Sequence, residues 1–172
     1  MLNKFFLLIV ALVIAISVDI KNGFSQQELS GRAVAIGGDT LRITSDEDKS
    51  KILIRLWGVD APELKQHCET KNGRSIDCGL LARDALDVII RGKNLTCVDF
   101  EKDTEGQLTA LCYLGDQILN GSVVRSGWAM AYRKESTDFV GLEKQARLGE
   151  KGIWEYKFDK PWLWRKLRKK TN

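Results

Sequence analysis

Five short strand-like segments grouped around one amphipathic helix constrain the fold of this chain most strongly. Leu29 to Ile36 and Thr40 to Thr44 flank a Gly-Gly turn, and a polar turn leads into a third segment that begins at Lys51. Beyond the helix, Asn94 to Phe100 and Leu108 to Leu114 have the pattern of a strand pair. This order predicts an α+β protein built on a five-stranded Greek-key barrel of the OB type. An open sheet with helices on one face is the alternative.

About three helices are expected beside the barrel. Gly79 to Arg91 carries a wide apolar stripe and is followed by Gly92, at the position where a C-cap glycine belongs. Ile118 to Ser126 reads as a short second helix that ends at a glycine. The third helix is expected from Ser136, as its cap, to Leu148.

Residues 1–25 have the pattern of a cleaved export signal. A run of 14 residues from Phe5 to Val18, apolar except for Ser17, follows a lysine and is too short for a typical membrane span. Small residues at Gly23 and Ser25 suit a cut before Gln26. We therefore expect an exported, periplasmic or secreted protein, with an uncleaved membrane anchor as the alternative.

The four cysteines fit an exported chain, because an even number in such a chain suggests two disulfides. Three pairings are possible. We favour Cys68–Cys78, which would close a polar loop, and Cys97–Cys112, which would join two neighbouring predicted strands. Zinc is the weaker alternative, since no two cysteines have a typical ligand spacing and His67 is the only histidine.

Residues 26–156 form the predicted domain, and residues 157–172 form a basic tail rich in tryptophan. The whole chain has a net charge of +4, and seven basic residues against one acid lie between Lys157 and Lys170. Trp162 and Trp164 next to these charges suit stacking on bases and attraction to phosphates. An anionic membrane surface suits them equally. A solvated basic end, with the tryptophans packed on the domain, is the third interpretation.

The third predicted strand contains a permanent cation within an apolar run, KILIRLWGVDAPE. Alternation places Arg55 on one face with Leu53 and Trp57, and because both faces are apolar we expect a strand covered on two sides. A buried guanidinium needs anionic or hydrogen-bonding partners. Arg55 therefore either forms a structural ion pair or directs its donors into a pocket, where they would bind phosphate.

Carboxylates lie around the exit of this strand. Asp60 and Glu63 flank a proline, and they are either ordinary turn and helix-start residues or a cation ligand and a proton acceptor. Asp39, in the turn that opens the neighbouring strand, is placed to reach the same mouth of the barrel. These residues are the candidate site.

Gly38–Thr40 (GDT) and Ile54–Glu63 (IRLWGVDAPE) together resemble the thermonuclease family, that is, the staphylococcal-nuclease-like domains. VVRSGWAMAY at Val123–Tyr132 and GIW at Gly152–Trp154 agree with the same family. The resemblance covers roughly Leu29 to Trp154. The cysteine pattern is similar to that of exported bacterial members.

This resemblance implies an OB-fold barrel and Ca²⁺-dependent cleavage of phosphodiester bonds in DNA and RNA. Asp39, Asp60 and the backbone carbonyl of Ala61 would be the Ca²⁺ ligands. Glu63 matches the general base, and Arg55 matches the arginine that clamps the scissile phosphate.

The same family places a tyrosine in its nucleotide pocket, which Tyr132 matches, and a second arginine in a D-x-x-G-R turn. In this chain the turn is DTEGQ, so the arginine position is Gln107, a neutral amide. Glu105 in the same turn would repel an incoming phosphate. Because loss of one electrostatic donor costs about 10²–10³ in rate, we expect reduced or altered activity.

Three classes of function remain open on the sequence alone. The first is a monomeric Ca²⁺-dependent nuclease with a weakened site that still turns over slowly, and in which Lys102, Arg133 or Lys134 could replace the missing cation. The second is a non-catalytic OB-type module that binds nucleic acid or another polyanion, which Gln107 and Glu105 support. An interaction protein of the cell envelope, using the tail, is a further alternative.

Overall fold

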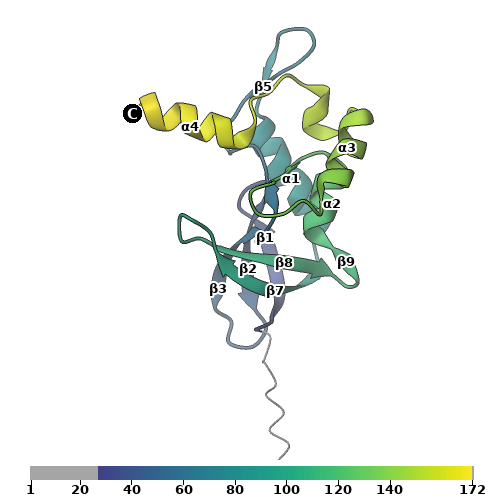
Figure 1. The fold of residues 1–172 in the computed structure, drawn as a ribbon. Helices are drawn as coiled ribbons and strands as arrows, with labels where there is room; N and C mark the ends of the chain where they lie inside the picture. The colour runs from purple at the N-terminus through teal and green to yellow at the C-terminus, as the bar shows by residue number, and fades with distance from the viewer. Residues whose placement is uncertain (1–26, 172) are drawn as a thin grey trace, which may run out of the picture.

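The computed structural model describes residues 27–171, so the predicted export signal lies outside the described part of the chain. A β-barrel forms one end of the molecule and helices α1, α2 and α3 gather at the other end (Figure 1). None of the helices within residues 27–171 has the length and apolar character needed to cross a membrane.

The barrel is one sheet with the strand order β3-β2-β1-β7-β8-β9. Its strands are β1 Leu29–Ala35, β2 Thr40–Ser45, β3 Lys51–Leu56, β7 Asn94–Lys102, β8 Leu108–Leu114 and the short β9 Gln117–Ile118. A parallel pairing of β3 with β8, with Arg55 opposite Thr109, closes the sheet. Since β9 is a two-residue strand that pairs only with β8, the predicted five-stranded barrel of the α+β class is confirmed.

Period-2 alternation explains which side chains fill the barrel. Leu41 and Ile43 of β2 and Ile54 and Leu56 of β3 are all fully buried. Leu53 on the other face of β3 is 50% exposed. The expectation that β3 is covered on both faces is therefore wrong, because only the inward face of this barrel strand packs on the core and its outward face meets solvent.

The predicted strand from Lys51 to Val59 is broken by a turn at Gly58. Gly58 has φ +72°, and a Cβ there would lie 2.9 Å from the ring of Phe139. Beyond the turn, β4 (Val59–Asp60) pairs with β10 (Met130–Ala131) in a separate two-stranded sheet. This break directs Asp60 out of the barrel wall to its mouth.

Two of the three predicted helices are confirmed to within a residue or two. They are α1 Cys78–Ile90 and α2 Leu119–Ser126. The third helix, α3 Val140–Leu148, begins later than expected. Two further helices follow it: the 3-10 helix η1 Gly152–Glu155 and the α-helix α4 Pro161–Thr171. Ser136 is not the cap of α3, because its hydroxyl accepts a bond from the Asp138 amide in the preceding turn. Within the basic tail, Pro161–Thr171 folds as α4.

Both favoured disulfides are present. Cys97 and Cys112 lie opposite each other on β7 and β8, and their bond joins the two strands. Cys68–Cys78 ties the start of α1 to a small hairpin of β5 (Cys68–Glu69) and β6 (Ser75–Ile76). Since all four cysteines are bonded to one another, no thiolate is left for zinc.

Candidate active site

Strand pairing brings four distant segments to one mouth of the barrel. Thr40, directly after Asp39, pairs with Arg55 between strands β2 and β3. Arg55 also pairs with Thr109 between strands β3 and β8. Asp60 at the end of β4 lies opposite Met130 of β10. The candidate residues predicted from separate motifs are thus neighbours because of the topology.

Asp39 is held toward the Asp60–Ala61 segment by hydrogen bonds. Its Oδ2 atom accepts from the main-chain amide of Ala61 at 3.0 Å, and its Oδ1 atom accepts from the Thr40 hydroxyl at 2.8 Å. Gly38 permits this approach, since a Cβ there would lie 2.7 Å from the Cβ of Ala61. Burial raises the pKa of Asp39, and the bonds from Ala61 and Thr40 offset part of that effect.

Arg55 is part-buried and fully engaged with protein partners. Its guanidinium pairs with the carboxylate of Glu135, its Nε donates to Asp103 Oδ2 at 3.3 Å, and its Nη1 donates to the Val59 carbonyl at 3.1 Å. Burial is the largest single effect and opposes its charge, but Glu135, Asp39 and Asp103 together outweigh it, so the pKa of Arg55 is raised. The ion-pair interpretation of Arg55 therefore holds, with partners in loops.

Asp60 and Glu63 both bind the guanidinium of Arg165, a residue that was not among the site residues predicted from the sequence. Arg165 of α4 donates from Nη1 to Asp60 Oδ1 at 2.8 Å and from Nη2 to Asp60 Oδ2 at 2.9 Å. The same Nη1 atom lies 2.7 Å from Glu63 Oε1. Burial raises the pKa of Asp60 to about 7, and the hydrogen bond from Arg165 acts in the opposite direction.

All these groups line one pocket of about 190 Å³. Its walls are formed by Asp39, Thr40, Arg55, Asp60, Glu63, Asp103, Thr104, Glu105, Gln107, Tyr132, Glu135 and Arg165. Six of these side chains are carboxylates and two are guanidiniums. A pocket with this excess of negative charge favours a cation and opposes a phosphate unless the charge is compensated.

Gln107 lies in this pocket, as its place in the motif predicts. Its amide nitrogen in the main chain donates to Asp103 Oδ1 at 2.9 Å, which closes the β7–β8 turn. None of the suggested replacements, Lys102, Arg133 or Lys134, is among the lining residues, and Arg133 instead pairs with Glu143. The second cation of the pocket is Arg165.

The donor set suits a hard divalent cation in its chemistry. Carboxylate and carbonyl oxygens are the ligands that Ca²⁺ prefers, and Asp39, Asp60 and Ala61 offer two carboxylates and one carbonyl. Besides burial, the charges of Asp39 and Glu63 raise the pKa of Asp60, whereas Arg165 lowers it. Within residues 27–171, no group of three or more His, Cys, Asp or Glu side chains has the geometry of a metal site.

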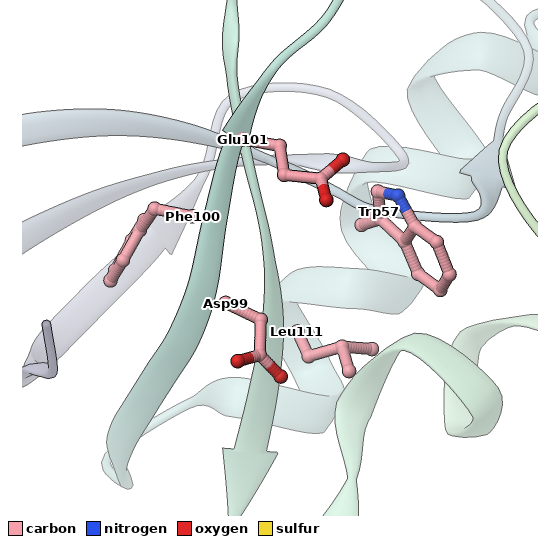
Figure 2. Close-up of a pocket in the computed structure, with 5 residues that line it drawn as sticks. All are labelled: Trp57, Asp99, Phe100, Glu101 and Leu111. Atoms are coloured by element: carbon pink, nitrogen blue, oxygen red, sulfur yellow. The ribbon is translucent and has the colours of Figure 1, made fainter. Parts of the chain in front are cut away.

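A second cavity, of about 360 Å³, lies at a bulge in β7 (Figure 2). Its lining residues are Trp57, Asp99, Phe100, Glu101 and Leu111. Figure 2 shows the Glu101 carboxylate directed toward Trp57, with the Phe100 ring on the opposite side of the strand. Two carboxylates and no basic side chain line this cavity, so it does not suit a phosphate group.

Sequence reasoning missed Glu135, which binds Arg55, and Arg165, which binds Asp60 and Glu63. Glu135 lies in an irregular loop without a motif around it. Arg165 was visible only as one charge of the basic tail. The one available signal was WLWRK itself, since tryptophans in a charged segment indicate packing on the domain.

Comparisons with known proteins show which family the chain belongs to. The pattern of the family described as "Staphylococcal nuclease homologue" matches residues 53–156. An "Uncharacterized endonuclease" of Escherichia coli O157:H7 is 31% identical over 143 residues, which cover 80% of this chain and 86% of that protein. The "Probable staphylococcal-like nuclease CAN1" of Oryza sativa subsp. japonica is 29% identical over 119 residues, covering 67% of this chain and 33% of that protein. The chain therefore belongs to the staphylococcal nuclease family.

Proposed function

We propose that the protein is a Ca²⁺-dependent endonuclease that hydrolyses phosphodiester bonds of DNA or RNA, with activity reduced by Gln107. The observation that carries the proposal is the meeting of Asp39, Arg55, Asp60 and Glu63 in one pocket. Two carboxylates for a cation, a third for proton transfer and a guanidinium for phosphate are the groups that this reaction needs.

Each residue has a separate task in this proposal. Asp39, Asp60 and the Ala61 carbonyl would hold Ca²⁺, which when bound supplies positive charge to the scissile phosphate. Glu63, whose side chain is 39% exposed, accepts the proton of the attacking water. Arg55 donates to the phosphate and stabilises the negative charge that develops on it.

Two features of the pocket support reduced activity. Gln107 can donate a hydrogen bond to phosphate but supplies no charge, and Arg55 must exchange Glu135 for the phosphate before it can act. Both effects raise the barrier to cleavage, because preorganised charge is what such a site contributes.

A groove beside the pocket supports a nucleic-acid substrate. We define the aromatic–basic groove as a cavity of about 740 Å³ lined by Trp154, Tyr156, Phe158, Trp162, Arg133, Arg147, Lys157, Lys160, Met130 and Glu143. Trp162 contacts Tyr132 of the active pocket, with ring centroids 5.9 Å apart. Aromatic rings for bases and cations for phosphates suit a single strand that continues from the site.

The disulfides bear on where the protein works. Such bonds persist in oxidising compartments outside the cytoplasm, and both bonds of this chain lie within the domain. Together with the export signal expected at residues 1–25, they support a periplasmic or secreted nuclease. Residues 26–156 would be its catalytic domain, and residues 157–172 an appended segment.

Incubation of the protein with plasmid DNA and with single-stranded DNA, in Ca²⁺ and in chelator, tests the proposal. We expect slow cleavage in Ca²⁺ and none in chelator. Arg55→Gln should abolish cleavage, whereas Arg91→Gln, which removes an exposed ion pair on α1, should leave it unchanged. Retained DNA binding without cleavage at any Ca²⁺ concentration would support the non-catalytic binding module instead.

A further inference from the structure

One face of α4 covers the active pocket. Trp162, Arg165 and Lys169 lie three and four positions apart, so they point to the same side of the helix. Trp162 packs on Tyr132, Arg165 binds Asp60 and Glu63, and Lys169 pairs with Glu105 at 2.8 Å. These contacts connect α4 to three separate walls of the pocket.

The guanidinium of Arg165 uses both oxygens of Asp60. Its two hydrogen bonds there measure 2.8 and 2.9 Å, and a third bond of 2.7 Å reaches Glu63. The Asp60 side chain is only 4% exposed, so few other groups can reach its carboxylate while α4 is in place. A divalent cation at Asp60 would therefore compete with Arg165 for the same two oxygens.

We propose that Arg165 is an internal counter-ion that competes with the divalent cation for Asp60, so that cation binding and the closed position of α4 exclude each other. The choice of Asp60 as a cation ligand rests on the proposed function. Because the cation binds only when the Arg165 contacts are broken, the free energy of those contacts is lost on binding. The affinity of the site for the cation is lowered by that amount.

The remaining contacts of α4 are weak enough to permit its release. Leu163 and Leu167 are 45% and 57% exposed, so they bury little apolar area against the domain. The Lys169–Glu105 pair is 72% and 67% exposed, and pairs of this kind stabilise little. Beside the packing of Trp162 on Tyr132, the Arg165 contacts are therefore the main charged link between α4 and the pocket.

Calorimetric titration of the full chain with Ca²⁺ tests this competition directly. We expect Arg165→Gln to bind Ca²⁺ at least about tenfold more tightly than wild type, since hydrogen bonds between charged groups no longer oppose binding. The matched control is Lys166→Gln, which removes one exposed charge from the same helix and should change affinity less than about twofold. Equal or weaker binding by Arg165→Gln overturns the proposal.

The titration also separates this proposal from the proposed function. Ca²⁺ binding that is equal in wild type and Arg165→Gln overturns the counter-ion alone. Absence of Ca²⁺ binding in every variant overturns the cation site and the counter-ion together.

Hydrogen–deuterium exchange gives a second readout that does not depend on activity. We expect the amides of α4 to exchange faster in Ca²⁺ than in chelator, while those of α1 are unchanged. In Arg165→Gln the exchange of α4 should be fast in both conditions. Slower exchange of α4 in Ca²⁺ would place the helix on the loaded site and overturn the proposal.

Cleavage at two Ca²⁺ concentrations separates a counter-ion from a group that acts on phosphate. At limiting Ca²⁺, Arg165→Gln should cleave faster than wild type, and at saturating Ca²⁺ the two should be equal. Slower cleavage by the variant at saturating Ca²⁺ would assign Arg165 to the phosphate and overturn the counter-ion role.

Discussion

The main-chain amide of Ala61 donates a hydrogen bond to Oδ2 of Asp39, 22 residues away along the chain. This bond joins the GDT turn to the residue directly after β4. It orients one carboxylate beside a second, that of Asp60, and so prepares the place where a cation would bind. The proposed cation site therefore depends on a contact between two segments that are distant in the sequence.

Asp39→Asn should weaken Ca²⁺ binding at least about tenfold, because a neutral amide replaces one of two carboxylate ligands. Calorimetric titration measures the affinity, and circular dichroism checks that the variant is folded. Asp116→Asn, at an exposed turn, is the control and should bind as wild type does. Unchanged affinity in Asp39→Asn would remove Asp39 from the ligand set.

Gln107→Arg should raise the rate of cleavage by about 10²-fold, which is the usual contribution of one electrostatic donor to such a reaction. The side chain already lines the pocket, so the new guanidinium starts within reach of the phosphate. Initial rates on single-stranded DNA at saturating Ca²⁺ measure the gain. Gln107→Met, similar in length but without charge, is the control and should show none. An equal rate in Gln107→Arg would mean that another group already supplies this charge.

Glu135→Gln should strengthen substrate binding by about three- to tenfold, since the charged partner of Arg55 is lost and its donors are freed for phosphate. The amide oxygen of the substituted side chain can still accept from the Gly58 amide, which Glu135 Oε2 binds at 2.8 Å in the wild type. Fluorescence anisotropy with labelled single-stranded DNA in chelator measures the affinity. Glu150→Gln, which breaks the exposed pair with Lys71, should leave it unchanged. A weaker affinity in Glu135→Gln would indicate that Glu135 positions Arg55.

Gly79→Ala should lower the free energy of unfolding by about 1–3 kcal/mol, the usual cost of overpacking. A Cβ at this position would lie 1.8 Å from the carbonyl oxygen of Glu63, so α1 or the segment that carries Glu63 must shift. Urea denaturation measures the loss. Gly141→Ala in α3 meets nothing within 4 Å and should raise stability by up to about 1 kcal/mol. A neutral Gly79→Ala would show that the segment yields without cost.

The barrel was predictable because its strands are short, alternate in polarity and end at recognisable turns. Leu41 and Ile54 fill its interior as the alternation requires. The break at Gly58 was not visible, since the apolar pattern continues from Ile52 to Val59 although the backbone turns at positive φ. Alternation reports which face a residue occupies but does not locate the end of a strand.

The site was predictable only in part. Asp39, Arg55, Asp60 and Glu63 belong to motifs, and the structure brings them into one pocket with Gln107 and Tyr132. Arg165 was beyond prediction, because its bond to Asp60 joins positions 105 residues apart and depends on where α4 packs. A residue that enters a site from a distant helix leaves no spacing in the sequence.

The parallel pairing of β3 with β8 has a consequence for how the protein reaches its working state. Arg55 meets Thr109 only when a long intervening segment, including all of α1, has folded back. Contacts between such distant positions form late and slow the folding of a domain. A newly made or partly unfolded chain thus lacks the pocket entirely, so catalytic competence should appear in one step with the completed barrel.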